Sequence, residues 1–182
     1  MLFAHDTVDV LSWLAALVNT LDEGVEQLRT PADLDGLLTE WKMTGRRLGT
    51  RRELAEVRTV RAAIGSVWEA GSVAEIVEIV NELFADSDAR PYLTRHDQQD
   101  WHLHLTESEA PLAQRIGAEA ALALVDLIRT GETGRLKHCA ADDCNAVLID
   151  LSKNHSRRFC DVGNCGNRMH VAAYRRRQAE QS

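Results

Sequence analysis

Apolar residues recur at helical spacing through most of the N-terminal two thirds of the chain. The stretch from Val8 to Leu21 is apolar over a broad stripe, which predicts a central helix that is buried on much of its surface. The same periodicity predicts four further helices, at Pro31 to about Gly45, about 51–70, about 73–85 and about 110–130. We therefore expect a mainly helical body up to residue 134.

Helix start signals support three of these predictions. Thr30 places a capping hydroxyl directly before a proline, a residue that is favoured at the first helical position. Thr50 and Ser72 each stand three residues before a glutamate. This is the spacing of a capping box, in which hydroxyl and carboxylate satisfy each other's backbone donors. The second, third and fourth helices are therefore expected to begin at these residues.

Residues 91–106 interrupt the helical pattern. Apolar and aromatic residues alternate with polar ones on both sides of the polar run 97–100, which predicts a β-hairpin. His102 and His104 would then share a face and could bind a metal, with His96 opposite. The favoured alternative is that these histidines form the solvated face of a half-buried strand.

Beyond residue 134, short apolar runs are separated by polar turns. This pattern predicts a hairpin with strands at 147–151 and 157–160, followed by a helix from Asn167 to about residue 178. Gly166, just before that helix, allows a close approach of the chain or unusual backbone dihedral angles. The tail therefore differs in kind from the helical body.

The four cysteines of the chain all lie in this tail, as two pairs. Four residues separate Cys139 from Cys144 and Cys160 from Cys165, and fifteen separate the pairs. A structural zinc ion takes four such ligands at tetrahedral corners, and two close pairs joined by a short hairpin supply them at little loop-closure cost. We therefore expect one structural Zn²⁺. The alternatives are unconnected core cysteines or two disulfides, and the lack of a signal-peptide pattern at the N-terminus argues against disulfides.

Together these elements predict a mainly α (α+β) fold in two domains. Residues 1–134 form a helical N-terminal domain with a β-hairpin. Residues 135–182 form a small treble-clef-like zinc finger, in which a β-hairpin and the C-terminal helix surround one zinc ion.

Charge is divided unevenly between these two regions. The chain carries a net charge of −7, but residues 1–134 carry −11 and residues 135–182 carry +4. A basic tail on an acidic body favours DNA as a partner of the tail. No apolar run approaches the length of a membrane span, so we expect a soluble cytoplasmic protein with no membrane partner.

Catalysis finds little support in the sequence. No glycine-rich phosphate loop, nucleophile elbow or metalloprotease helix motif occurs. Four cysteine ligands would also close the coordination sphere of zinc and leave no position for water. We therefore expect no enzymatic activity and no catalytic residues.

A polar step interrupts the first predicted helix near its end. Asn19 and Thr20 follow a run of apolar residues there. In a buried helix these two side chains could line a cavity for a small-molecule ligand. The alternative is that they only satisfy neighbouring backbone groups.

The tail resembles the CGNR zinc fingers, a family named for the tetrapeptide that stands here at residues 165–168. The resemblance includes the first cysteine pair, the turn at 150–154 and the segment Ser156-Arg157-Arg158-Phe159-Cys160. Such fingers commonly follow an ABATE domain, and Leu17-Val18-Asn19-Thr20 resembles its early signature. The resemblance implies a bacterial stress-responsive transcription regulator that binds DNA through the finger and a ligand through the body.

Basic residues of the tail are the candidate DNA contacts. Arg168 and Arg175 are seven residues apart and would share a helix face, from which arginines can read guanine and clamp phosphates. Asn167 could contact adenine or cap the helix. The full set is Lys153, Arg157, Arg158, Asn167, Arg168, Arg175, Arg176 and Arg177. The alternative for the arginine run is a solvated helix end, where cations face the helix dipole favourably.

Two functions of different classes follow from these observations. The first is a DNA-binding transcription regulator, expected as a homodimer because reading paired half-sites through one short finger calls for two copies. The second is a protein-interaction module, in which zinc only folds the tail. Its basic surface would then dock an acidic partner, such as the chain's own body.

Overall fold

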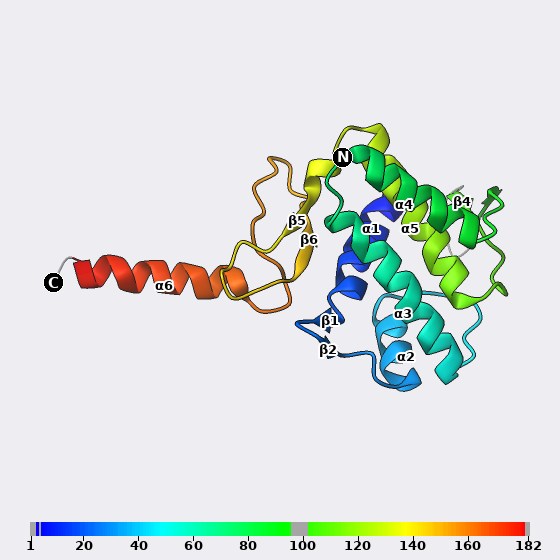
Figure 1. The fold of residues 1–182 in the computed structure, drawn as a ribbon, viewed down its shortest axis with the longest axis horizontal. Coiled ribbons are helices and arrows are strands. Elements are labelled where there is room, and N and C mark those ends of the chain that lie inside the picture. Colours follow the sequence, from blue (N-terminus) through cyan, green and yellow to red (C-terminus); the bar gives the residue numbers. More distant parts are fainter. Residues whose placement is uncertain (1–2, 4, 96–101, 181–182) are drawn as a thin grey trace.

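The fold is given by a computed structural model, which describes residue 3 and residues 5–95 and 102–180 (Figure 1). Its α-helices are α1 (His5–Val18), α2 (Pro31–Glu40), α3 (Arg51–Gly65), α4 (Val73–Asp86), α5 (Leu112–Arg129) and α6 (Cys165–Glu180). Two short 3₁₀ helices are η1 (Ser66–Trp68) and η2 (Thr133–Arg135). The strands pair as antiparallel hairpins, β1 (Leu21–Asp22) with β2 (Val25–Glu26), β3 (Tyr92–Thr94) with β4 (His102–His104), and β5 (Leu136–His138) with β6 (Val147–Ile149). The predicted fold class, mainly helical with small hairpins, is confirmed.

Helix α5 lies at the centre of the body and packs against α1, α3 and α4 (Figure 1). Its larger apolar side chains, such as Ile116 and Leu124, are fully buried. Gly117 marks a close approach to the end of α4, because a Cβ atom there would lie 2.6 Å from the Oγ atom of Ser87. Removal of this apolar surface from water is the main stabilising contribution to the body.

The helix caps form with one difference from the predicted pattern. At the start of α2, Thr30 and Asp33 make a complete capping box, with each side chain accepting from the other's backbone N–H. At the start of α3, the Thr50 hydroxyl accepts from the Glu53 backbone, as predicted. The Glu53 carboxylate reaches further back than a capping box requires, however, and accepts from the backbone N–H of Leu48. The glutamate at the start of α4 behaves in the same way.

The first helix begins and ends three residues earlier than predicted. It ends at Val18, and the chain continues into the β1–β2 hairpin. The turn residues Glu23 and Gly24 both have positive φ angles, of 47° and 79°. Two consecutive positive φ angles are the requirement of a tight type I′ hairpin turn, which is incompatible with a continuing helix. Helix α2 ends earlier than predicted, at Glu40 rather than near Gly45.

The hairpin predicted within residues 91–106 is present as β3 and β4, with Leu93 opposite Leu103. The ring of His104 packs at a tilt against Tyr92, with ring centroids 5.8 Å apart. His96 and the side chain of His102 lie outside the described residues. Among the residues that are described, His104 belongs to no group of metal-ligating side chains.

The hairpin of the tail uses a different strand from the one predicted. Strand β6 pairs with β5, which precedes the first cysteine pair, and not with residues 157–160. The backbone of residues 157–160 serves loop contacts instead. The N–H of Arg157 donates to the carboxylate of Asp150, and the carbonyl of Arg158 accepts from the N–H of Ala140. The prediction of a second strand at 157–160 was therefore wrong.

Strand β6 joins the body to the tail. Its residues Val147 and Ile149 belong to the apolar core of the body, whereas Leu148 belongs to the small core around the cysteines. The carboxamide of Asn19 accepts a hydrogen bond from the Val147 N–H at 2.8 Å and donates one to the Val147 carbonyl at 2.9 Å. The indole Nε1 of Trp68 donates to the Leu148 carbonyl at 3.1 Å. Asn19 thus satisfies the Val147 backbone groups that face away from β5, and Trp68 adds a second contact from the body to the strand.

Replacing Asn19 by alanine should reduce the free energy of unfolding by roughly 2–4 kcal/mol, because it leaves a buried backbone donor and acceptor unpaired. The measurement is urea unfolding of the zinc-loaded protein, followed by tryptophan fluorescence. Asn145→Ala is the matched control, since Asn145 is exposed and its side chain donates to the carboxylate of Glu23 at 3.3 Å. Equal effects of the two substitutions would contradict the proposed link between body and tail.

Candidate metal centre and nucleic-acid interface

The four cysteine sulfurs converge on one point. The Sγ atoms of Cys139, Cys144, Cys160 and Cys165 all lie within 4.8 Å of one another. The Sγ atoms of Cys144 and Cys160 are 3.6 Å apart, and those of Cys160 and Cys165 are 3.7 Å apart. A tetrahedral zinc ion with Zn–S bonds of about 2.3 Å separates its sulfurs by about 3.8 Å, so the cluster fits one zinc ion closely. The four cysteines are positioned to bind a single structural zinc.

Local structure brings each sulfur to this point. Cys139 directly follows β5, and Cys144 lies in the turn that leads to β6. Cys165 is the first residue of α6. The backbone N–H of Cys160 donates to the Sγ atom of Cys139 at 3.5 Å, which ties the second pair to the first. This arrangement of hairpin, loop and helix around one metal site agrees with the treble-clef-like expectation.

Arg168 contacts Cys165 and the loop between Cys139 and Cys144. Its Nη1 and Nη2 atoms donate to the carboxylate of Asp143 at 2.6 and 3.1 Å, and Nη2 also donates to the Sγ atom of Cys165 at 3.2 Å. The hydrogen bond from Arg168 lowers the pKa of the Cys165 thiol to about 7 and also lowers the pKa of Asp143. Arg168 therefore favours the thiolate form of Cys165, the form that binds metal.

A buried carboxylate, Asp150, organises the loop between the cysteine pairs. It accepts from the Nζ atom of Lys137 at 2.6 Å, from the N–H and hydroxyl of Ser152, and from the N–H of Arg157. Burial by itself raises the pKa of Asp150, but the hydrogen bonds from Lys137 and Ser152 outweigh it and bring the pKa to about 2. Asp150 is therefore ionised at neutral pH and holds the loop that carries Cys160.

Several predicted DNA contacts are engaged within the tail itself. Arg157 donates to the carboxylate of Asp161 and to the carbonyl of Phe159. The guanidinium of Arg158 lies over the Phe159 ring, 5.8 Å from its centroid. Asn167 donates to the side chain of Asn164, just before α6. These groups, together with Arg168, shape the finger.

The remaining predicted contacts are exposed. Helix α6 extends away from the rest of the molecule, and its C-terminal half contacts little else (Figure 1). Arg175, Arg176 and Arg177 lie on this half, and no ion pair joins them to another described side chain. Lys153, at the turn after β6, is exposed in the same way. The structure thus brings Arg168 to the metal site but presents the arginine run to solvent.

Asn19 and Thr20, the predicted ligand-lining residues, both have hydrogen-bond partners within the protein. Asn19 uses its carboxamide on the Val147 backbone. The hydroxyl of Thr20 donates to the Leu17 carbonyl and accepts from the guanidinium of Arg61. Both follow the end of α1 rather than lying within it, and their side chains hydrogen-bond to β6, to the end of α1 and to α3.

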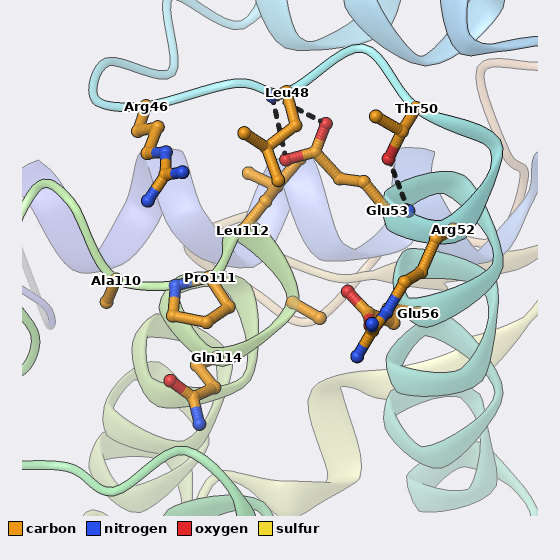
Figure 2. Close-up of a pocket in the computed structure, with 11 residues that line it drawn as sticks. Arg46, Leu48, Thr50, Arg52, Glu53, Glu56, Ala110, Pro111, Leu112 and Gln114 are labelled. Carbon is orange, nitrogen blue, oxygen red and sulfur yellow. Dashed lines mark hydrogen bonds and ion pairs between the residues drawn. The ribbon is translucent and has the colours of Figure 1, made fainter.

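A cavity of about 500 Å³ lies elsewhere in the body, between the segment before α3 and the first turns of α3 and α5 (Figure 2). Arg46 and Arg52 line it from different sides, and Gln114 and Glu53 contribute further polar groups. Leu48, Pro111 and Leu112 supply apolar surface. Its lining includes neither Asn19 nor Thr20.

Sequence reasoning missed two contributors to the site. The acceptor role of Asp150 had a detectable signal, because an aspartate two residues before a serine is typical of an Asx turn. Asp143 had no such signal, since its partner Arg168 is 25 residues away. Only the folded chain brings these two together.

Two protein-family models together match most of the chain. A family model described as "CGNR zinc finger" matches residues 135–178. The ABATE family model, described as "Putative stress-induced transcription regulator", matches residues 11–131. Neither is a family of enzymes. No curated protein matches the chain. Among the described residues, no helix has both the length and the apolar character needed to cross a membrane.

Replacing Asp150 by alanine should destabilise the protein by roughly 2–3 kcal/mol, because several donors of the loop lose their common acceptor. Urea unfolding of the zinc-loaded protein measures this change. Asp142→Ala is the control, since Asp142 is exposed and no hydrogen bond joins it to another described residue. Its expected effect is within about 0.5 kcal/mol. A stability of Asp150→Ala equal to that of the control would contradict the organising role of this carboxylate.

Proposed function

The chain belongs to the ABATE family and ends in a CGNR zinc finger, and on this premise we propose that it is a zinc-containing transcription regulator that binds DNA through α6. The observation that carries the proposal is the basic run Arg175, Arg176 and Arg177, exposed on a helix that extends away from the body (Figure 1). Side chains of this type clamp phosphates and read guanine in the major groove.

The shape of α6 supports this proposal. It spans 16 residues, and a helix of that length is about 24 Å long. A helix of this size is only marginally stable in water without packing partners, and few residues after Met169 are even partly covered. The major groove is about 12 Å wide and admits an α-helix. Binding there would supply the contacts that the free helix lacks.

The charge distribution supports the same orientation on DNA. The body carries −11 over residues 1–134, so phosphates repel it, whereas the tail carries +4. The exposed side chain of Lys153 lies at the turn after β6 and can add a phosphate contact. We expect two copies on a DNA site, because a single helix contacts only one half-site.

Response to a signal is assigned to the body. The cavity between the first turns of α3 and α5 has the size of a small-molecule site, about 500 Å³ (Figure 2). Its lining combines apolar side chains with two arginines, a glutamine and carboxylates. We therefore propose this cavity, and not the surroundings of Asn19, as the place where a ligand of the body binds.

The direct test is a titration of the zinc-loaded protein against its own promoter region and a scrambled duplex, at low and at physiological salt. A preference for the promoter that persists at physiological salt is the expected result. Binding that is equal for both duplexes and is lost as salt rises would favour the protein-interaction function instead.

Replacing Arg175, Arg176 and Arg177 together by alanine should abolish promoter binding at physiological salt. Each lost phosphate contact should also reduce the slope of log K against log[salt] by about 0.9. Fluorescence anisotropy with labelled duplex measures both quantities. Arg90→Ala removes an arginine of the body whose side chain is 81% exposed and lies outside the lining of the proposed cavity, and it should leave binding unchanged. Retained affinity in the triple variant would refute DNA recognition by α6.

A further inference from the structure

The arginine of the CGNR tetrapeptide lies at the metal centre rather than on the free part of α6. Arg168 is in the first turn of the helix, three residues after the ligand Cys165. Its guanidinium forms a two-pronged ion pair with Asp143 and donates a further hydrogen bond to the Cys165 sulfur. Asp143 directly precedes Cys144 in the first cysteine pair. One side chain thus bridges the two halves of the zinc site.

We propose that Arg168 is a positioning residue for the zinc ligands and does not read DNA bases. Its contacts fasten the turn that carries Cys144 to the helix that carries Cys165 and hold the Cys165 thiolate toward the metal. Zinc affinity measures the positioning role without DNA, so failure of this inference can be told apart from failure of the proposed DNA-binding function.

The geometry of the guanidinium excludes simultaneous base reading. Bidentate recognition of guanine needs two parallel N–H donors from one edge of an arginine. In Arg168 the Nη1 and Nη2 atoms are both committed to the Asp143 carboxylate, and Nη2 also serves the Cys165 sulfur. To read a guanine, Arg168 would have to give up these contacts. Arg175 has no such commitment among the described residues.

The positive charge of Arg168 stabilises a zinc site that carries negative charge. Four thiolates and one Zn²⁺ together carry a charge of −2, which a nearby cation stabilises. Hydrogen bonds to ligating groups orient them and tune their basicity, and their removal typically weakens metal binding by 10-fold to 100-fold.

The surrounding chain leaves room for this arrangement. A Cβ atom at Gly163 would lie 3.2 Å from the Cys165 sulfur and 3.8 Å from the Nη2 atom of Arg168. The absence of a side chain there keeps the space beside the sulfur open for the guanidinium. Because the side chains of Arg168 and Asp143 are 46% and 65% exposed, their ion pair alone contributes little. Loss of the hydrogen bond from Arg168 to the Cys165 sulfur should therefore account for most of the change in zinc affinity when Arg168 is replaced.

The test compares Arg168→Gln, Arg168→Lys and Asp143→Asn in the full chain. Zinc affinity comes from competition with a chromophoric chelator, and the rate of zinc release is followed with the same chelator in excess. The cobalt-substituted protein adds a spectroscopic readout, because its sulfur-to-metal charge-transfer band reports on the ligating thiolates. Circular dichroism of the zinc-loaded variants checks that the body is folded.

The proposal predicts that Arg168→Gln weakens zinc binding by roughly 10-fold to 100-fold and shifts the charge-transfer band. Arg168→Lys should keep part of the affinity, because lysine retains the positive charge but lacks the paired N–H donors of the planar guanidinium. Asp143→Asn should have a smaller effect than Arg168→Gln. Combining the two substitutions should be no worse than Arg168→Gln alone, since both remove the same bridge.

Arg175→Ala is the matched control on the same helix, and its zinc affinity and zinc-release rate should equal those of the wild type. Unchanged zinc affinity and an unshifted cobalt band in Arg168→Gln would overturn the proposal. So would tighter promoter binding by zinc-saturated Asp143→Asn with no change in zinc affinity, because that result would mean that the released guanidinium reads DNA.

Discussion

Strand β6 is the constraint on which the rest of the structure depends. Successive side chains of a strand point to opposite faces, so three residues here serve two cores. Val147 and Ile149 pack into the body, and Leu148 packs against the cysteine cluster. Asn19 of the body satisfies the Val147 groups on the free edge of the strand, and Trp68 of the body donates to the Leu148 carbonyl. Folding of the tail therefore cannot be separated from folding of the body.

Two different kinds of interaction hold the tail together beyond this strand. Zinc ligation crosslinks residues that are far apart in the sequence, and Asp150 gathers the donors of the loop between the cysteine pairs. Because the zinc ligand Cys165 is the first residue of α6, the metal site fixes the base of this helix, which extends away from the rest of the molecule (Figure 1). Its distal arginines are then displayed without contact to the acidic body. A rigid base and an exposed basic end are the features that a groove-binding helix requires.

The arginines of the tail divide into two groups by what surrounds them. Arg157 and Arg168 each have an aspartate partner, and Arg158 lies over an aromatic ring. The arginines near the end of α6 have no comparable contact among the described residues. Net charge alone does not distinguish these groups, since every arginine counts equally in the sum. The local partners decide which cations are available to a phosphate backbone.

The sequence alone determined the helical body, the zinc ligands and the family, because these depend on local periodicity, capping pairs and cysteine spacing. Cap residues such as Thr30 and Thr50 act over three or four residues, so their pattern is readable directly. The tertiary structure decided which strands pair: β6 pairs with β5 because the backbone of 157–160 is used by the Asp150 loop. It also decided the contacts of Asn19 and Arg168, whose partners Val147 and Asp143 lie 128 and 25 residues away. Contacts over such separations leave no local pattern, because only the folded chain brings their two ends together.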